Sequence, residues 1–133
     1  MRKGDGLLLG RALLALIGLW LVTSPWVFGY ARHGHALQDT AVGALLVGAA
    51  AASALAGTAG VVSLWFALAL GLWTFLTPMM FGQAGFTFSA NNDLVIGPVT
   101  VLAAAMAIVS RARLRLYASI AAPHAASEQT SLW

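Results

Sequence analysis

The chain has 133 residues, of which 60% are hydrophobic and only 8% are charged, and its mean hydropathy is +0.85. Soluble proteins carry about 25% charged residues, so this composition excludes a soluble globular domain and indicates a membrane protein. The absence of cysteine excludes disulfides, cysteine-ligated zinc, iron–sulfur clusters and attached c-type haem. The net charge of +3 does not indicate nucleic acid, because the basic residues flank apolar segments as membrane anchors do.

An apolar run follows a short basic segment at the N-terminus. It extends from Leu7 to Phe28 and is interrupted only by Arg11. This length can cross a hydrocarbon core of ~30 Å, and no small-x-small cleavage site follows it. We therefore predict a cytoplasmic N-terminus over residues 1–8 and a first transmembrane helix over about 9–28.

A proline and a glycine close this first span. Pro25 has no N–H, so the carbonyl of Leu21 loses its helical partner, and Gly29 can take the positive φ that ends a helix. Aromatic side chains are typical of the headgroup level. We predict a helix exit at the membrane surface formed by Ser24, Pro25, Trp26 and Gly29.

The same stretch occurs twice. The segment Gly18–Gly29 reads GLWLVTSPWVFG, and Gly71–Gly82 reads GLWTFLTPMMFG. An amide, an acid and then a glycine follow each copy: Gln38, Asp39 and Gly43 after the first, Asn92, Asp93 and Gly97 after the second. We therefore predict two tandem two-helix repeats, over residues 9–57 and 58–110.

The second predicted span covers about residues 39–56. Asp39 stands where an N-cap would accept orphan N–H groups and meet the positive end of the helix dipole. Small residues recur every four positions, a pattern that lets helix backbones approach closely in lipid. They are Ala44, Gly48, Ala52 and Ala56, and the GTAG segment at 57–60 predicts a tight turn after them.

The third and fourth predicted spans cover about residues 61–80 and 93–110. Thr77, Pro78 and Gly82 repeat the helix exit, and Asp93 repeats the cap. The loop at 83–92 between these spans carries Phe86 and Phe88 as candidate partner contacts. Residues 111–133 form a basic flank and a C-terminal tail that ends in Trp133, a further candidate contact.

The basic residues predict the orientation. Six of the seven lysines and arginines lie at one end of the predicted spans, and only Arg32 lies at the other. The positive-inside rule then places both termini in the cytoplasm. The predicted fold is an all-α, integral membrane four-helix bundle whose two repeats are related by a pseudo-two-fold axis along the membrane normal.

These motifs resemble the SPW repeat family of small bacterial membrane proteins. The resemblance rests on Ser24, Pro25 and Trp26 within GLW-x4-PW-x-FG, followed by an acid and a glycine, and it covers about Leu13 to Val109. It implies two-helix units and a location in the bacterial cytoplasmic (inner) membrane. The second copy departs from the motif, with Thr77, Pro78 and Met79.

Several residues allow both a structural and a functional interpretation. Asp39 and Asp93 are explained as helix caps, with ion or proton handling as the alternative. Trp20 and Trp73 fall near mid-membrane, where packing competes with a pigment, quinone or lipid contact. The basic triplet Arg111, Arg113 and Arg115 is a stop-transfer flank or a binding site for anionic lipid. His33 and His35 are interpreted as solvated, since further metal ligands are lacking on their side.

The sequence predicts no catalytic, metal or cofactor site, no nucleic-acid partner and no soluble substrate, because no residue set supplies acid, base and nucleophile together. We expect a non-catalytic accessory subunit of a larger membrane complex, such as a respiratory or photosynthetic one. Its predicted partners are other integral membrane subunits and membrane lipids. The alternative is a small oligomeric transporter or channel, or a lipid-interacting membrane protein.

Overall fold

A computed structural model describes the backbone of residues 4–29, 33–55, 57–80 and 88–130, and their side chains except at 33–35, 88–89 and 121–130. This part of the chain consists of four helices, which confirms the predicted all-α class. They are α1 (Asp5–Phe28), α2 (His33–Ala52), α3 (Gly57–Met80) and α4 (Phe88–Thr130).

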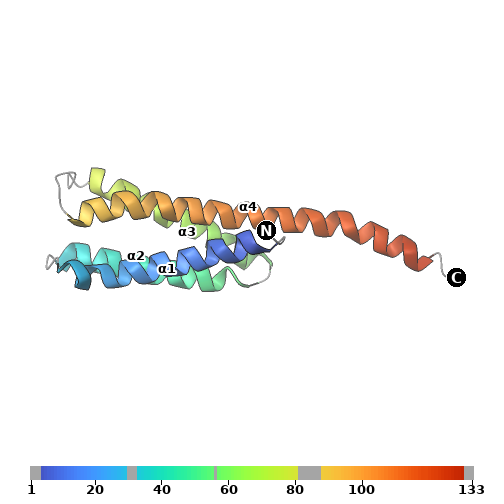
Figure 1. Cartoon of the computed structure of the whole chain (residues 1–133), viewed down its shortest axis with the longest axis horizontal. Coiled ribbons are helices and arrows are strands. Elements are labelled where there is room, and N and C mark those ends of the chain that lie inside the picture. The colour runs from blue at the N-terminus through green and yellow to red at the C-terminus, as the bar shows by residue number, and fades with distance from the viewer. Residues whose placement is uncertain (1–3, 30–32, 56, 81–87, 131–133) are drawn as a thin grey trace.

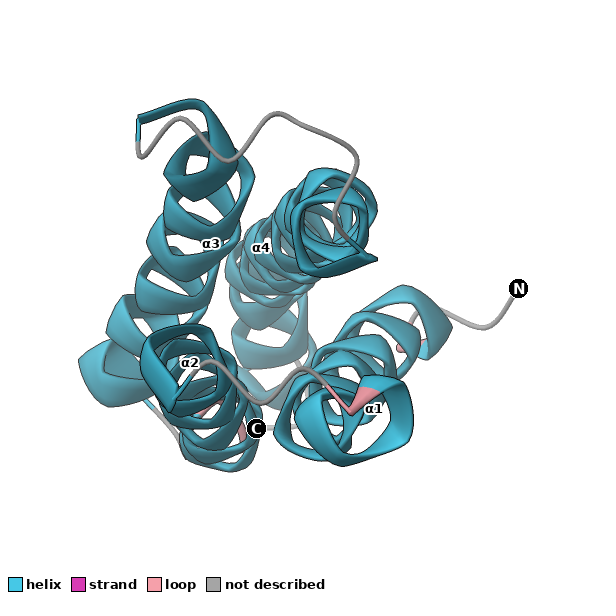
Figure 2. Ribbon diagram, turned by 90° about the vertical axis from the view of Figure 1, so that its left-hand side faces the viewer, coloured by secondary structure: helices cyan, strands magenta, loops and turns pink. Residues whose placement is uncertain are grey.

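The helices form two antiparallel hairpins, α1 with α2 and α3 with α4, that pack side by side (Figure 1). Viewed along the bundle, α1 stands diagonally opposite α3, and α2 opposite α4 (Figure 2). Between neighbouring helices, contact is most extensive within the hairpins, smaller between α1 and α4, and smaller again between α2 and α3. We call the end where α1 and α3 finish the proline end, and the end where they begin the arginine end.

Glycines allow the two helices of each hairpin to cross closely. A Cβ atom on Gly43 would lie 2.6 Å from the carbonyl oxygen of Gly18 and 2.8 Å from the amide nitrogen of Val22. In the second hairpin, a Cβ atom on Gly97 would lie 2.7 Å from the amide nitrogen of Phe75. Because these neighbours are backbone atoms that cannot move aside, only glycine permits this close approach of the helices.

The core combines large side chains from α1 with small ones from α4. Leu14 and Leu21 on α1 are fully buried, as are Ala104 and Ala107 on α4. In lipid, apolar burial gives little net driving force, so close packing of small residues carries the association of the helices. The remaining core side chains are Ile17, Val42, Leu46, Ala49, Ala50, Leu64, Ala67 and Ala103.

Three helical segments are long and apolar enough to cross a membrane: Asp5–Phe28, Gly57–Met80 and Ala90–Ile120. The shorter α2 has 20 residues, which at ~1.5 Å per residue span about 30 Å, the thickness of a bilayer core. These helices are those of a membrane protein, as the composition predicts.

The ends of α1 and α3 agree with the predicted ends at residues 28 and 80. Helix α1 continues for three residues past Pro25, and Gly29 then closes it with φ 60° in the left-handed region, which glycine adopts without strain. The proline therefore stands in the last turn of the helix, as the predicted exit requires.

The other helix bounds differ from the predicted ones. Helix α2 begins at His33 and ends at Ala52, not at 39 and 56. The GTAG segment forms the first turn of α3, and the chain reverses just before it, where Leu55 donates to the carbonyl of Ala52. Helix α4 continues to Thr130, because the Ala-, Leu- and Arg-rich sequence after residue 110 favours helix. It projects far beyond the other three helices (Figure 1).

Candidate functional site

Two carboxylic acids lie inside the bundle near the proline end. Asp39 on α2 is 3% exposed and Asp93 on α4 is 2% exposed. The two carboxyl groups lie within electrostatic range of one another, since α2 and α4 face each other across the bundle (Figure 2). Buried acids in a membrane span are costly and mark functional sites by default.

The predicted capping role of both acids is wrong. Helix α2 begins six residues before Asp39, and α4 begins five residues before Asp93. A cap must stand at the first turn, where N–H groups lack helical partners. Both acids lie beyond the first turn of their helices, and both side chains are buried in the bundle.

We call Asp39, Asn92 and Asp93 the acidic cluster, and Trp20 of α1 makes a polar contact with it. The indole N–H of Trp20 donates to Oδ1 of Asn92 at 3.0 Å, which joins α1 to α4. Within the described part of the chain, Oδ1 of Asp93 and Nδ2 of Asn92 are buried without a hydrogen-bond partner. The cluster therefore retains hydrogen-bonding capacity for a proton, an ion or water.

The two mid-span tryptophans are not equivalent. Trp20 also packs edge-to-face on Phe28, with ring centroids 6.0 Å apart. Trp73 makes no such polar contact with the residues that the structure describes. Both are nearly half exposed, so neither packs in the bundle interior, and their predicted pigment, quinone or lipid contact stays a prediction.

The serine of the first motif compensates for its proline. Pro25 cannot donate to the carbonyl of Leu21, and the Ser24 hydroxyl donates to that oxygen at 3.2 Å. In the second motif the hydroxyl of Thr77 donates to the carbonyl of Trp73 at 2.8 Å. Trp73 already accepts the helical bond from Thr77 itself, so this hydroxyl does not replace the bond lost at Pro78.

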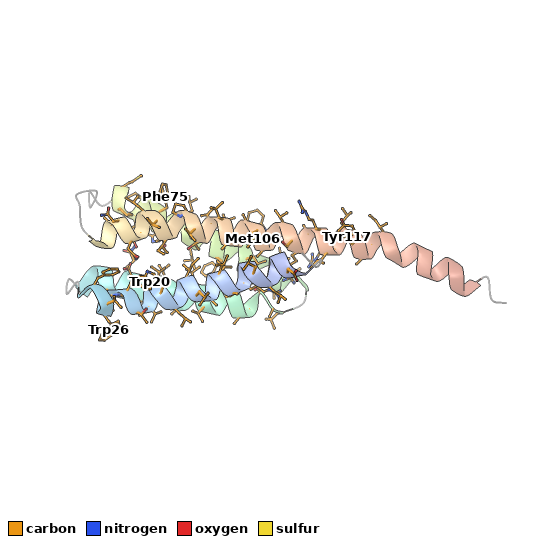
Figure 3. The ribbon with its side chains drawn as sticks, in the orientation of Figure 1. Trp20, Trp26, Phe75, Met106 and Tyr117 are labelled. Atoms are coloured by element: carbon orange, nitrogen blue, oxygen red, sulfur yellow. The ribbon has the colours of Figure 1, made fainter. Side chains whose placement is uncertain are left out.

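The third motif position faces outward in both copies. Trp26 is 84% exposed and points away from the bundle (Figure 3). Its counterpart Met79 is also exposed. An exposed indole at the end of a span is typical of the aromatic belt, and the location of the motif at the membrane surface stays a prediction.

At the arginine end, guanidinium groups cover the carbonyls at the end of α2. Arg111 donates to Ser53 at 2.8 Å, to Leu55 at 3.0 Å and to Gly57 at 3.2 Å. Arg11 also donates to the Ser53 carbonyl. The carbonyls of Ser53 and Leu55 lie just past the end of α2, where carbonyl groups lack helical donors and cations stabilise the negative end of the helix dipole. Arg111 therefore fastens the α2–α3 turn to α4.

The other two arginines of the triplet differ from Arg111. Arg115 donates once, to the carbonyl of Gly57 at 3.1 Å. Arg113 is exposed, and it has no hydrogen bond or ion pair with the described residues. Arg111 and Arg115 therefore contact the α2–α3 turn, whereas the stop-transfer and lipid-binding interpretations of the triplet stay predictions.

Two residues of the predicted small-residue stripe of α2 are exposed. Ala44 and Gly48 are exposed, and a Cβ atom on Gly48 would meet nothing within 4 Å. They line an open groove of about 590 Å³ between α2 and α3, whose other walls include Val62 and Phe66. The close approach predicted from this stripe occurs instead at the glycine crossings within the hairpins.

Some predicted positions lie outside the described residues or side chains, namely Gly82, Phe86, Phe88, Trp133, His33 and His35. Among the described side chains, no three histidine, aspartate or glutamate residues gather as metal ligands would. Sequence reasoning missed the glycine crossings and Asn92, although Gly18 with Gly71, and Gly43 with Gly97, stand at matching places in the two copies and could have indicated the crossings.

Comparison with known proteins identifies one similarity. The model of the SPW repeat domain matches residues 9–107, which is more than half of the chain. No curated protein and no solved structure matches. The matched region contains both glycine crossings, both proline motifs and the two buried acids. The chain therefore belongs to the SPW repeat family.

Proposed function

We propose that this protein is a non-catalytic component of a larger membrane protein assembly, and that it binds a transmembrane helix of another integral membrane subunit. The observation that carries the proposal is the groove between α2 and α3. It lies between two neighbouring helices that contact one another less than the helices of either hairpin do, and it leaves a face of the bundle open to lipid or to a partner.

The chemistry of the groove favours a helix as its occupant. Ala44, Gly48 and Ala52 line it at four-residue spacing, and such small residues allow another backbone to approach closely in lipid. Val62 and Phe66 supply larger apolar contacts on the opposite wall. A groove with a flat small-residue wall and a bulky wall accepts the ridge of side chains along a neighbouring helix.

The extension of α4 supplies a second contact surface. Beyond the bundle, Leu116, Tyr117 and Ile120 are each more than half exposed. A helix that leaves its bundle with apolar side chains exposed gains stability when a partner covers them. The predicted docking role of the tail, residues 111–133, is part of the same proposal.

We place the protein in the bacterial cytoplasmic membrane with both termini in the cytoplasm, so that the arginine end faces inward. We further propose that the two hairpins are repeat units related by a pseudo-two-fold axis along the membrane normal. The matching positions of Gly18 with Gly71 and of Gly43 with Gly97 support this relation. Respiratory or photosynthetic complexes are assemblies that such a subunit would fit.

A single substitution in the groove tests the proposal. Gly48→Leu should fill the groove without disturbing the bundle, since nothing lies within 4 Å of its Cβ position. Mild-detergent extraction of the tagged protein, native-gel sizing and mass spectrometry should show a defined complex for the wild type and its loss for Gly48→Leu. The matched control is Ala12→Leu, an exposed small residue on α1. A wild type that migrates alone, or a complex that Gly48→Leu leaves intact, would refute the proposal.

The buried acids favour one second candidate, a small oligomeric transporter or channel for protons or cations. Asp39 and Asp93 lie inside the span and close to one another. Under this alternative, Asp39→Asn and Asp93→Asn should abolish a proton or cation flux across proteoliposomes. A flux that is absent from the wild type, or unchanged in both variants, would exclude this candidate.

A further inference from the structure

A second cavity lies between α3 and α4 at the arginine end. Its volume is about 240 Å³, and it joins two chemically different parts. One part, which we call the lower part, is lined by apolar side chains. The other, which we call the upper part, carries the guanidinium groups of two arginines. The lining residues that matter here are Val61, Leu64, Trp65, Ile108, Arg111 and Arg115.

The two arginines differ in how many donors they have left. Arg111 is held in place by three hydrogen bonds to carbonyls. Arg115 makes one bond, to Gly57, and a guanidinium has five N–H groups. Arg115 therefore lines the cavity with most of its donors unused, beside an arginine that three hydrogen bonds hold in place.

We propose that this cavity binds an anionic glycerophospholipid, with its phosphate on Arg111 and Arg115 and an acyl chain along Trp65, Val61 and Ile108. Guanidinium groups bind phosphate oxygens through paired, charge-assisted hydrogen bonds. The cavity lies between two helical segments that can cross a membrane, so an acyl chain can follow α3 into the bilayer. This inference goes beyond the proposed function and does not depend on it.

The shape of the lining favours a lipid over a soluble phosphate. Trp65 is 56% exposed and Leu64 is buried, so the lower part offers an apolar wall of the kind that a lipid tail covers. Apart from the arginines, the cavity lining is apolar. A free phosphate would contact only the upper part and leave the rest of the cavity unfilled.

The test measures lipid retention by the whole protein in detergent, by native mass spectrometry. Phosphatidylglycerol and phosphatidylcholine with identical acyl chains are titrated against the wild type, Arg115→Gln and Arg113→Gln. We expect tighter retention of phosphatidylglycerol and a roughly fivefold loss in Arg115→Gln, which is the contribution of one basic residue near an anionic surface. Arg113→Gln removes the same charge from outside the cavity and should retain the lipid as the wild type does.

Three outcomes would overturn the proposal. Equal retention of the two lipids would show that the arginines do not recognise an anionic headgroup. Equal losses in Arg115→Gln and Arg113→Gln would show diffuse attraction to the charged end instead of a site. Displacement of phosphatidylglycerol by millimolar inorganic phosphate would identify a soluble phosphate as the ligand. Trp65→Ala adds a check on the apolar part, since it should weaken retention of phosphatidylglycerol without altering the fold of the arginine end.

Discussion

In both the α1–α2 and the α3–α4 hairpin a glycine lets the two helices cross closely, but the hairpins differ in the polar contacts at their helix exits. A Cβ atom added to Gly43 or to Gly97 would lie less than 3 Å from backbone atoms of the facing helix. At the helix exits, the Ser24 hydroxyl donates to the carbonyl that Pro25 leaves without a partner. The Thr77 hydroxyl donates to a carbonyl that already has its helical partner. The packing of the hairpin is thus common to both, and the chemistry of the helix exit is not.

The difference separates two kinds of constraint. A glycine at a crossing is required by the distance between two backbones, which any side chain would increase. A hydroxyl beside a proline only improves one hydrogen bond, so another arrangement can replace it at a moderate cost. We therefore expect variants at the crossings to have large and equal effects, and variants at the exits to have small and unequal ones.

The largest effects should come from the crossings. Gly43→Leu and Gly97→Leu should each destabilise the protein by about 3 kcal/mol or more, because the helices must separate to admit the side chain. Equilibrium unfolding in mixed micelles measures this, with Gly48→Leu as the matched control that has open space around it. A large loss in only one of the two crossing variants would show that the hairpins do not depend on the same contact.

The next largest effect should come from the arginine end, where the hairpins differ because α2 stops at Ala52 and α4 continues to Thr130. Arg111→Gln removes three hydrogen bonds to the α2–α3 turn and should cost about 1.5–3 kcal/mol, the range for a hydrogen bond to a charged group. Limited proteolysis should show earlier cleavage in the turn. Arg113→Gln is the control, and equal behaviour of the two variants would contradict the role assigned to Arg111.

A smaller effect should distinguish the two proline motifs. Ser24→Ala leaves the buried Leu21 carbonyl without a donor and should cost about 1–2 kcal/mol. Thr77→Val removes a bond to a carbonyl that keeps its helical partner, so it should cost less than about 1 kcal/mol. Thermal unfolding of both variants in the same detergent decides the matter, and a larger loss in Thr77→Val would reverse our account of the motifs.

The smallest difference concerns the two tryptophans. Trp20→Phe loses the hydrogen bond to Asn92 and should cost about 1 kcal/mol, while Trp73→Phe should be close to neutral. A double-mutant cycle of Trp20→Phe with Asn92→Ala isolates the bond, because the two losses should not add. Additive losses would show that the indole N–H contributes nothing.

The sequence predicted the ends of α1 and α3 because Pro25, Gly29 and Pro78 constrain the backbone locally. It misplaced the starts of α2 and α4 because aspartate is a common N-cap residue, which made Asp39 and Asp93 the predicted caps. The residue type alone does not show that a carboxyl group is buried among other helices. The glycine crossings depend on which helices become neighbours. The role of Arg111 depends on a turn more than fifty residues away along the chain, so no local pattern indicates it.

The arginine end has an electrical consequence. Arg11, Arg111 and Arg115 all donate to neutral carbonyl oxygens, so these bonds leave their positive charges uncompensated. Moving one elementary charge across a membrane potential of 100 mV changes the free energy by about 2.3 kcal/mol. For three charges the change is roughly 7 kcal/mol. An energised membrane therefore favours the proposed orientation, with this end on its negative side, so the arginines that close the α2–α3 turn would also contribute to the direction of insertion.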